Sequence, residues 1–156
     1  MAVQINIQVE GIRQLQKKLK VTADKLKNMR QFWSSVGLYV QKQTIKERFD
    51  KEQSPEGQKW KPLAPSTVKR RLKRHKKGNM KILQDTGELR RNISHPTALQ
   101  VGDSYVRFGT KLKYARTHQF GRGKIPARPF LGVNESEKKH ITSMFRQYLK
   151  RNILGG

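Results

Sequence analysis

No regular element can run through residues 51–65 of this chain, and this constrains the fold more than any other feature. The stretch contains three prolines and one glycine, which interrupt both helices and strands. Connections of this length inside a compact domain are uncommon and usually functional. We therefore expect a long irregular arm at 51–65, with the regular structure on either side of it.

Two kinds of periodicity precede the arm. Apolar and polar residues alternate over residues 2–9, which predicts a strand with one buried face. Apolar residues then recur at three- and four-residue spacing over 12–28 and again over 31–50, which predicts two amphipathic helices. The first of these helices has a strongly basic outer face.

After the arm, the pattern predicts a basic helix over 66–77 and an antiparallel hairpin with strands at 98–102 and 104–110. Asn134 and Glu137 have the spacing of a capping box before a last helix at 135–152. The expected fold class is therefore α+β, in a single domain spanning 1–156. A small, mainly antiparallel sheet packs on three longer helices, and residues 51–81 project as the arm and the basic helix.

The charge of the chain restricts its partners. It has 35 Lys and Arg against 11 Asp and Glu, for a formal net charge of +24. A surface of this kind attracts polyanions or acidic proteins. Cysteine is absent, and no apolar run has the length of a membrane-spanning helix or a secretory signal. We expect a protein that is made and kept in the cytosol of its producer and has no membrane partner.

The basic residues are concentrated in one segment. Between Glu56 and Asp85 there is no acidic residue. On a helix at 66–77, Val68 and Leu72 mark the inner side and cations cover the rest. The candidate contacts to DNA or to an acidic partner are Lys69, Arg70, Arg71, Lys73, Arg74, Lys76 and Lys77. A solvated helix or a contact between subunits explains the same cluster, and base-specific recognition is not expected because no DNA-reading motif accompanies it.

Motifs for catalysis are missing. The four histidines lack metal-ligand spacing, no glycine-rich phosphate loop is present, and the carboxylates fall mainly on predicted caps, turns and helix surfaces. We therefore expect no catalytic residue, no metal and no cofactor. A small nuclease is the least favoured alternative.

Several short strings, taken in order, resemble the phage virion morphogenesis family, the tail-completion proteins of long-tailed phages. The similarity spans roughly residues 45–150. The strings are Pro55-Glu-Gly57-Gln-Lys-Trp60-Lys-Pro62-Leu63, Ile82-Leu83-Gln-Asp-Thr86-Gly87-Glu-Leu89, Val106-Arg-Phe108-Gly109-Thr110, His118-Gln119-Phe120-Gly121 and Ile125-Pro126-Ala127-Arg128-Pro129-Phe130-Leu131-Gly132.

The resemblance implies a structural protein of the virion neck rather than an enzyme. Such a protein acts at the head-proximal end of the tail, where it joins tails to filled heads as a ring around the DNA passage, with a hexamer favoured. Its partners are further copies of itself and other neck and tail proteins, such as the tail tube, connector or stopper, and packaged DNA in the lumen is a possible contact. The protein is expected in the host cytoplasm during assembly and then in the virion. The alternative is a free basic nucleic-acid-binding protein.

Most motif residues have an architectural interpretation. Pro126 and Pro129 hold a segment that delivers Phe130 to the core, and Arg128 forks onto a carboxylate or onto carbonyls. His118 is expected to be a hydrogen-bonded structural residue rather than a base. The other motif residues are also expected to support the fold rather than to act on a substrate; they are Thr86, Gly87, Leu89, Gln119, Phe120 and Gly121. Two alternatives stay open for Trp60, Pro62 and Leu63: contact with a neighbouring subunit, or, for Trp60, coverage of the chain's own core.

Overall fold

A computed structural model describes residues 12–74 and 80–154. Three predictions fall wholly or partly outside these ranges: the strand at residues 2–9, the last residues (75–77) of the basic helix, and the contacts assigned to Lys76 and Lys77. The α+β class is confirmed, because the described residues form helices and one small antiparallel sheet.

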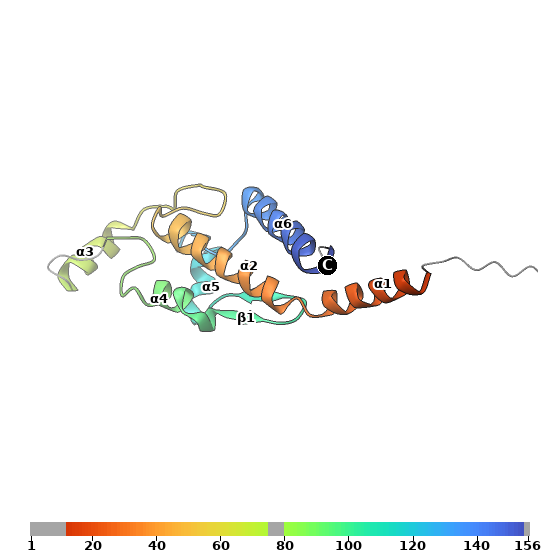
Figure 1. The fold of residues 1–156 in the computed structure, drawn as a ribbon. Helices are drawn as coiled ribbons and strands as arrows, with labels where there is room; N and C mark the ends of the chain where they lie inside the picture. The colour runs from red at the N-terminus through yellow and green to blue at the C-terminus, as the bar shows by residue number, and fades with distance from the viewer. Residues whose placement is uncertain (1–11, 75–79, 155–156) are drawn as a thin grey trace, which may run out of the picture.

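The helices before the arm match the sequence pattern closely. Helix α1 covers Ile12–Lys27 and α2 covers Arg30–Gln43, and α2 continues without a break as the π-helical turn η1, Thr44–Phe49. The predicted helix at 31–50 is therefore confirmed as the combined α2–η1 element. It forms the long central element of the molecule (Figure 1).

The elements after the arm include the predicted basic helix, hairpin and last helix, in that order, with two further short helices between them. They are α3 (Pro65–Arg74), α4 (Glu88–Ser94), the 3-10 turn η2 (Pro96–Ala98), β1 (Leu99–Val101), β2 (Val106–Phe108), α5 (Lys113–Phe120), α6 (Glu135–Leu149) and the π-helical turn η3 (Lys150–Leu154). The capping box of α6 is confirmed. The Asn134 side chain accepts from the backbone N–H of Glu137, and the Glu137 carboxylate accepts from that of Asn134.

The sheet in the described residues is a two-stranded hairpin. Leu99 pairs with Phe108 and Val101 with Val106, so both strands are shorter than the predicted 98–102 and 104–110. In Figure 1, α2 lies between α6 above it and the hairpin below it. Gly37 allows this close approach, since a Cβ there would lie 2.8 Å from the Val106 side chain.

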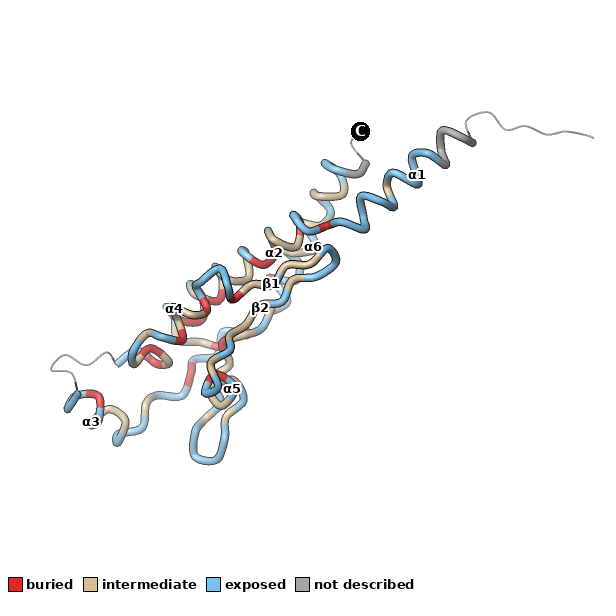
Figure 2. Tube along the Cα trace, turned by 90° about the horizontal axis from the view of Figure 1, so that it is seen from below, coloured by how far each residue is buried: buried red, intermediate tan, exposed pale blue. Residues whose placement is uncertain are grey.

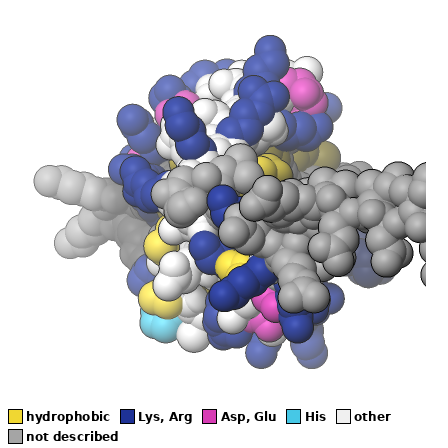
Figure 3. Space-filling view, turned by 45° about the vertical axis from the view of Figure 1, so that its right-hand side comes forward, with side chains coloured by type: hydrophobic (Ala, Val, Ile, Leu, Met, Phe, Trp, Pro, Cys, Tyr) yellow, Lys and Arg dark blue, Asp and Glu magenta, His cyan; other side chains and the backbone are white. Residues whose placement is uncertain are grey.

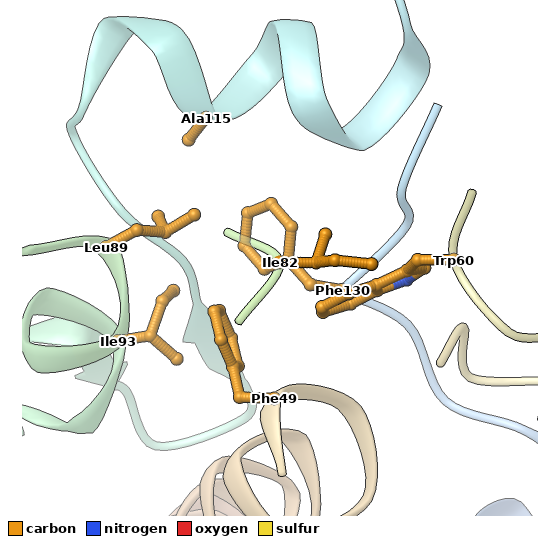
Figure 4. Close-up of a cluster of buried hydrophobic side chains, with 7 residues drawn as sticks. All are labelled: Phe49, Trp60, Ile82, Leu89, Ile93, Ala115 and Phe130. Atoms are coloured by element: carbon orange, nitrogen blue, oxygen red, sulfur yellow. The ribbon is translucent and has the colours of Figure 1, made fainter. Parts of the chain in front are cut away.

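Two apolar clusters hold these layers together. The larger joins η1, the arm, the segment before α4, α4 itself, α5 and the segment after α5. Figure 4 shows its side chains pointing toward one another; its members are Phe49, Trp60, Ile82, Leu89, Ile93, Ala115 and Phe130. The smaller joins the start of α2 to α6 and consists of Met29, Phe32 and Val36, with Phe145 and Tyr148 packed against it. Burial of these side chains provides the main stabilisation of the domain.

Helix α1 forms as predicted but does not bury its apolar face. On this face Leu19 and Leu26 are 59% and 41% exposed. The base of α1 is tied by the Lys25 ammonium, which donates to the carbonyl of Asn152 at 2.8 Å, and the helix then runs away from the domain (Figures 1 and 2). The apolar face of α1 therefore lacks the burial in its own domain that its amphipathic pattern predicts.

The arm does not present its aromatic residue to solvent. Trp60 is 5% exposed, and its ring packs edge-on against Phe49 with 5.8 Å between the ring centroids. Its indole N–H donates to the carbonyl of Pro129 at 2.9 Å. The interpretation of Trp60 as an anchor for a neighbour is therefore wrong for this conformation, because the core of the same chain offers both apolar contact and a hydrogen-bond acceptor.

Candidate functional site

Segments far apart in the sequence meet around Arg128. The Arg128 side chain is 6% exposed, and its Nε and Nη2 donate at 2.9 Å to the carbonyls of Lys61 and Pro62. Its backbone N–H donates to the carbonyl of His118 at 2.7 Å. Either a carboxylate or carbonyls were expected as acceptors, and the structure has carbonyls. These two hydrogen bonds, which we call the Arg128 fork, connect the arm to the segment after α5.

Gln119 holds the next two residues of that segment. Its side-chain oxygen accepts from the backbone N–H groups of Phe130 and Leu131, both at 3.0 Å, and its amide donates to the carbonyl of Leu131 at 2.8 Å. Phe130 is fully buried as a result. The extended, proline-bounded segment therefore delivers Phe130 to the core as predicted.

Glycines end or begin the short helices of the motifs. Gly121 follows α5 with φ of 76°, and a Cβ there would lie 2.9 Å from the backbone nitrogen of Ala127. Gly87, with φ of 70°, precedes α4 as its N-cap residue. The Thr86 hydroxyl accepts from the N–H of Glu88, the first residue of α4, at 3.3 Å.

Phe120, the aromatic residue of the motif at the end of α5, lies on the surface. Phe120 is 72% exposed and so has no structural role in the core of this chain, contrary to expectation. Leu89 does have that role, since it is 2% exposed and belongs to the larger cluster.

These motifs line one large hollow, which we call the basic groove. It has a volume of about 1020 Å³. Its walls are formed by residues 61–65, 85–89 and 124–126, together with Thr67, Arg70, Arg71, Leu83, Tyr114, His118 and Arg128. Its lining combines apolar side chains with many charged and polar ones, so it can offer both apolar contact and charge to a partner.

The groove is positively charged. Arg70 and Lys124 add to the charges of Lys61, Arg71 and Arg128, and Asp85 and Glu88 are its acidic members. Burial, together with repulsion from Arg71, lowers the pKa of Arg128. Lys and Arg side chains also dominate the face of the molecule drawn in Figure 3, where Asp and Glu are few. The arrangement therefore suits an anionic group on a partner.

Two titratable side chains on α5 border the groove. The Tyr114 hydroxyl donates to Glu88 at 2.9 Å, and burial together with this acidic partner raises the pKa of Tyr114 to about 12. Burial, reinforced by the nearby Arg128 charge, lowers the pKa of His118. Within residues 12–74 and 80–154, the buried Nδ1 of His118 has no hydrogen-bond partner, so the expected hydrogen bond of this side chain is not made there.

Helix α3 divides the predicted basic contacts into two groups. Lys69, Arg70, Lys73 and Arg74 are exposed. Arg71 is 5% exposed, pairs with Asp85 at 3.4 Å and donates to the carbonyl of Lys81. Arg71 is therefore a structural residue and not a surface contact. Leu72, expected on the inner side, is 53% exposed.

The comparisons with known proteins identify the family. Residues 10–150 match the model of the phage virion morphogenesis family. The chain belongs to this family. It is also 34% identical over 110 residues to the Mu-like prophage FluMu G protein 1 of Haemophilus influenzae, an alignment that covers 70% of this chain and 73% of that protein. No solved structure matches the chain.

The features of the candidate site fall within the part of the chain that matches the virion morphogenesis family. The Arg128 fork, the Gln119 clamp and the basic groove all lie within the matched residues. The family assigns the chain a role in phage virion morphogenesis, with other virion proteins as its partners, and points to a structural rather than an enzymatic protein.

Neither a metal site nor a membrane span is found in the part of the virion morphogenesis protein that the structure describes. In residues 12–74 and 80–154, no three His, Asp or Glu side chains gather where they could hold a metal ion. In the same residues, no helix is both long and apolar enough to cross a bilayer.

One buried pair was not predicted. Arg48 is 1% exposed, and its two terminal nitrogens donate to the two carboxylate oxygens of Glu137 at 2.5 and 2.6 Å. It also donates to the carbonyl of Gly132 at 3.2 Å. The capping-box signal identified Glu137 as a helix cap, but no local pattern connects it to a residue 89 positions away.

Replacing Arg128 with Lys should loosen the groove. A Lys ammonium is a point charge and does not reproduce the planar fork onto two carbonyls. We expect the free energy of unfolding to fall by about 1.5–3 kcal/mol, the range for hydrogen bonds to charged groups. Urea unfolding measures this, with the exposed Arg116→Lys on α5 as the control. Equal unfolding midpoints for both variants would contradict the role assigned to Arg128.

The lowered pKa of His118 predicts a pH dependence of stability. Because the folded state binds the His118 proton less tightly than the unfolded state, stability rises with pH across the interval between the two pKa values. The free energy of unfolding should therefore fall as the pH drops below about 6.5, the ordinary pKa of histidine. Urea midpoints at pH 7.5 and pH 5 test this. His118→Gln should lose this component of the pH dependence, whereas the exposed His140→Gln should retain it.

Proposed function

We propose that the chain is a structural protein of the phage neck that completes the tail and joins it to the head. It forms a ring, with a hexamer favoured, at the head-proximal end of the tail around the DNA passage. Family membership supports the virion role. The shape and surface of the chain support the ring.

The observation that carries the ring is the difference between the two ends of the molecule. At one end α1 projects with its apolar residues in solvent, and at the other lies α3, beside the basic groove (Figure 1). Contacts between unlike surfaces are head-to-tail, and such contacts close into rings when the rotation permits. An elongated subunit with dissimilar ends fits this arrangement.

The exposed cations of α3 fit a position close to packaged DNA. Lys69, Arg70 and Lys73 have no carboxylate partner in the part of the chain that the structure describes, whereas Arg71 and Arg74 both pair with Asp85. Phosphate neutralisation requires charge but no particular spacing. The basic groove, with its apolar walls, suits an acidic segment of a neck neighbour, such as the tail tube, connector or stopper, better than it suits duplex DNA.

The decisive experiment uses the phage or prophage that carries the gene. Loss of the protein should leave filled heads and finished tails unjoined in induced lysates viewed by electron microscopy, and supplying the protein should restore whole virions. The protein should be found at the neck of the restored particles. Normal particles in its absence, or a position away from the neck, would contradict the proposal.

The cluster on α3 favours a second candidate, a free nucleic-acid-binding protein. It predicts tight duplex binding, with an affinity that falls with salt at a log-log slope of about −0.9 for each phosphate contacted. The triple variant Lys69→Gln, Arg70→Gln and Lys73→Gln should then abolish binding. It leaves Arg71 and Arg74 on Asp85, so the fold is retained. Unchanged affinity would exclude this candidate.

A further inference from the structure

The amino-terminal segment has the sequence of a strand but needs a sheet. In residues 2–9 apolar side chains at 3, 5, 7 and 9 alternate with polar ones. A strand requires partners for its backbone N–H and C=O groups and a surface for its apolar side. In residues 12–74 and 80–154, the sheet that could receive it is the β1–β2 hairpin.

The β2 edge of that hairpin is free. The N–H of Gly109 donates to the carbonyl of Ala98, and the N–H of Gly102 donates to the carbonyl of Tyr105. Because hydrogen-bonded pairs alternate along an antiparallel ladder, the Gln100–Arg107 pair between them is also a hydrogen-bonded pair. The backbone groups of Val106 and Phe108 therefore point away from β1, and no hydrogen bond to them is found within the described residues. On the opposite edge the N–H of Leu99 already donates to the carbonyl of Pro96.

Helix α1 runs away from the hairpin of its own chain (Figures 1 and 2). The joint between α1 and α2 lies at the hairpin tip, where the N–H of Met29 donates to the carbonyl of Asp103 at 2.9 Å. From there α1 runs outward for 16 residues, or about 24 Å (Figures 1 and 2). Residues 2–11 span about 33 Å when fully extended. If they folded back along α1, most of that length would be used to reach the tip of the hairpin, and little would remain to pair with β2.

We propose that residues 2–9 of one copy add as a third strand to the β2 edge of a neighbouring copy. The inference rests on the proposed ring and names the contact that builds it. The periodicities agree, because Val106 and Phe108 face inward while Arg107 is exposed. An added strand with its odd-numbered residues inward continues this apolar side toward α2 and places Gln4, Asn6 and Gln8 beside Arg107.

Charge favours the same partner. Glu10 is the only charged side chain among residues 1–11, whereas the remainder of the chain holds all 35 Lys and Arg. The segment is therefore the part of the chain that a strongly basic neighbour repels least. Strand addition uses backbone hydrogen bonds for affinity and alternate side chains for specificity, which needs no further charge. Each copy donates a strand at one end and accepts one on its hairpin, as a closed ring requires.

Engineered disulfides in the full chain test the proposal, because the natural sequence has no cysteine. An Arg107→Cys protein is mixed with Gln4→Cys, Asn6→Cys or Gln8→Cys proteins, oxidised, and analysed by mass spectrometry of the linked peptides. At least one of these pairs should form a covalent dimer. Ile5→Cys and Ile7→Cys are matched controls that should not link to residue 107, because their side chains point to the opposite face.

Two further variants separate the remaining outcomes. Gln100→Cys lies on β1, one strand further away, so a link to residue 100 in place of residue 107 would overturn the assignment of the β2 edge. A double Asn6→Cys, Arg107→Cys variant that closes only within one molecule would overturn the exchange between copies. Absence of every link in a protein that still assembles would overturn the strand addition but leave the ring, whereas a protein that stays monomeric in every assay would overturn both.

Discussion

Replacing Arg48 with Met is expected to lower the free energy of unfolding by about 3–5 kcal/mol, the usual cost of removing one partner from a buried ion pair. The change leaves Glu137, which is 6% exposed, without its guanidinium. It also removes the tie between η1 and the start of α6, since Arg48 contacts Glu137 and Gly132 together. Urea unfolding followed by circular dichroism measures the effect.

The double variant Arg48→Met, Glu137→Leu is the matched control. With both charges gone, no unpaired carboxylate remains in the interior, so most of the loss should be recovered. The part not recovered is about 1 kcal/mol, because Glu137 also completes the capping box of α6. A single variant as stable as the wild type would contradict the account of this pair.

Replacing Trp60 with Ala should cost about 3–5 kcal/mol in the free energy of unfolding, as for other large-to-small changes in a core. The indole fills the space beside Phe49 and Phe130 and donates to the carbonyl of Pro129 (Figure 4). The loss should be present in the monomer, at concentrations where no assembly occurs. Thermal and urea unfolding of the dilute protein measure it.

Two further variants separate the causes of the stability loss expected for Trp60→Ala. Trp60→Phe keeps much of the apolar contact and loses the hydrogen bond, so its cost should be smaller than that of Trp60→Ala. Pro62→Ala changes an exposed residue of the same arm and should have little effect. If Trp60→Ala weakened assembly but left the dilute monomer as stable as the wild type, Trp60 would be a contact between subunits after all.

Local signals in the sequence predicted the elements well, because the forces that define them act within a few residues. The spacing of apolar residues predicted α1, α2–η1 and α6, and the capping box predicted where α6 begins. The hairpin was predicted from its turn residues, and only its length differed. Glycine at position 121 ended α5 for the steric reason that its positive φ indicates.

Long-range partners could not be predicted, because no sequence pattern records them. The pairing of Arg48 with Glu137 joins two helices far apart in the chain, and the Arg128 fork meets carbonyls of the arm rather than a carboxylate. The exposed apolar face of α1 is the opposite case. There the periodicity correctly predicts the helix, but the expected packing of its apolar face is not found in the described part of the chain.

The mass of the purified protein in solution tests the central claim, the ring, most directly. Light scattering at high and low salt, with and without duplex DNA, distinguishes assembly of the chain with itself from assembly on nucleic acid. The account predicts a discrete DNA-free oligomer at high salt, with about six times the 18.2 kDa mass of the chain. A monomer that gains mass only when DNA is added would contradict the ring and favour the free nucleic-acid-binding protein.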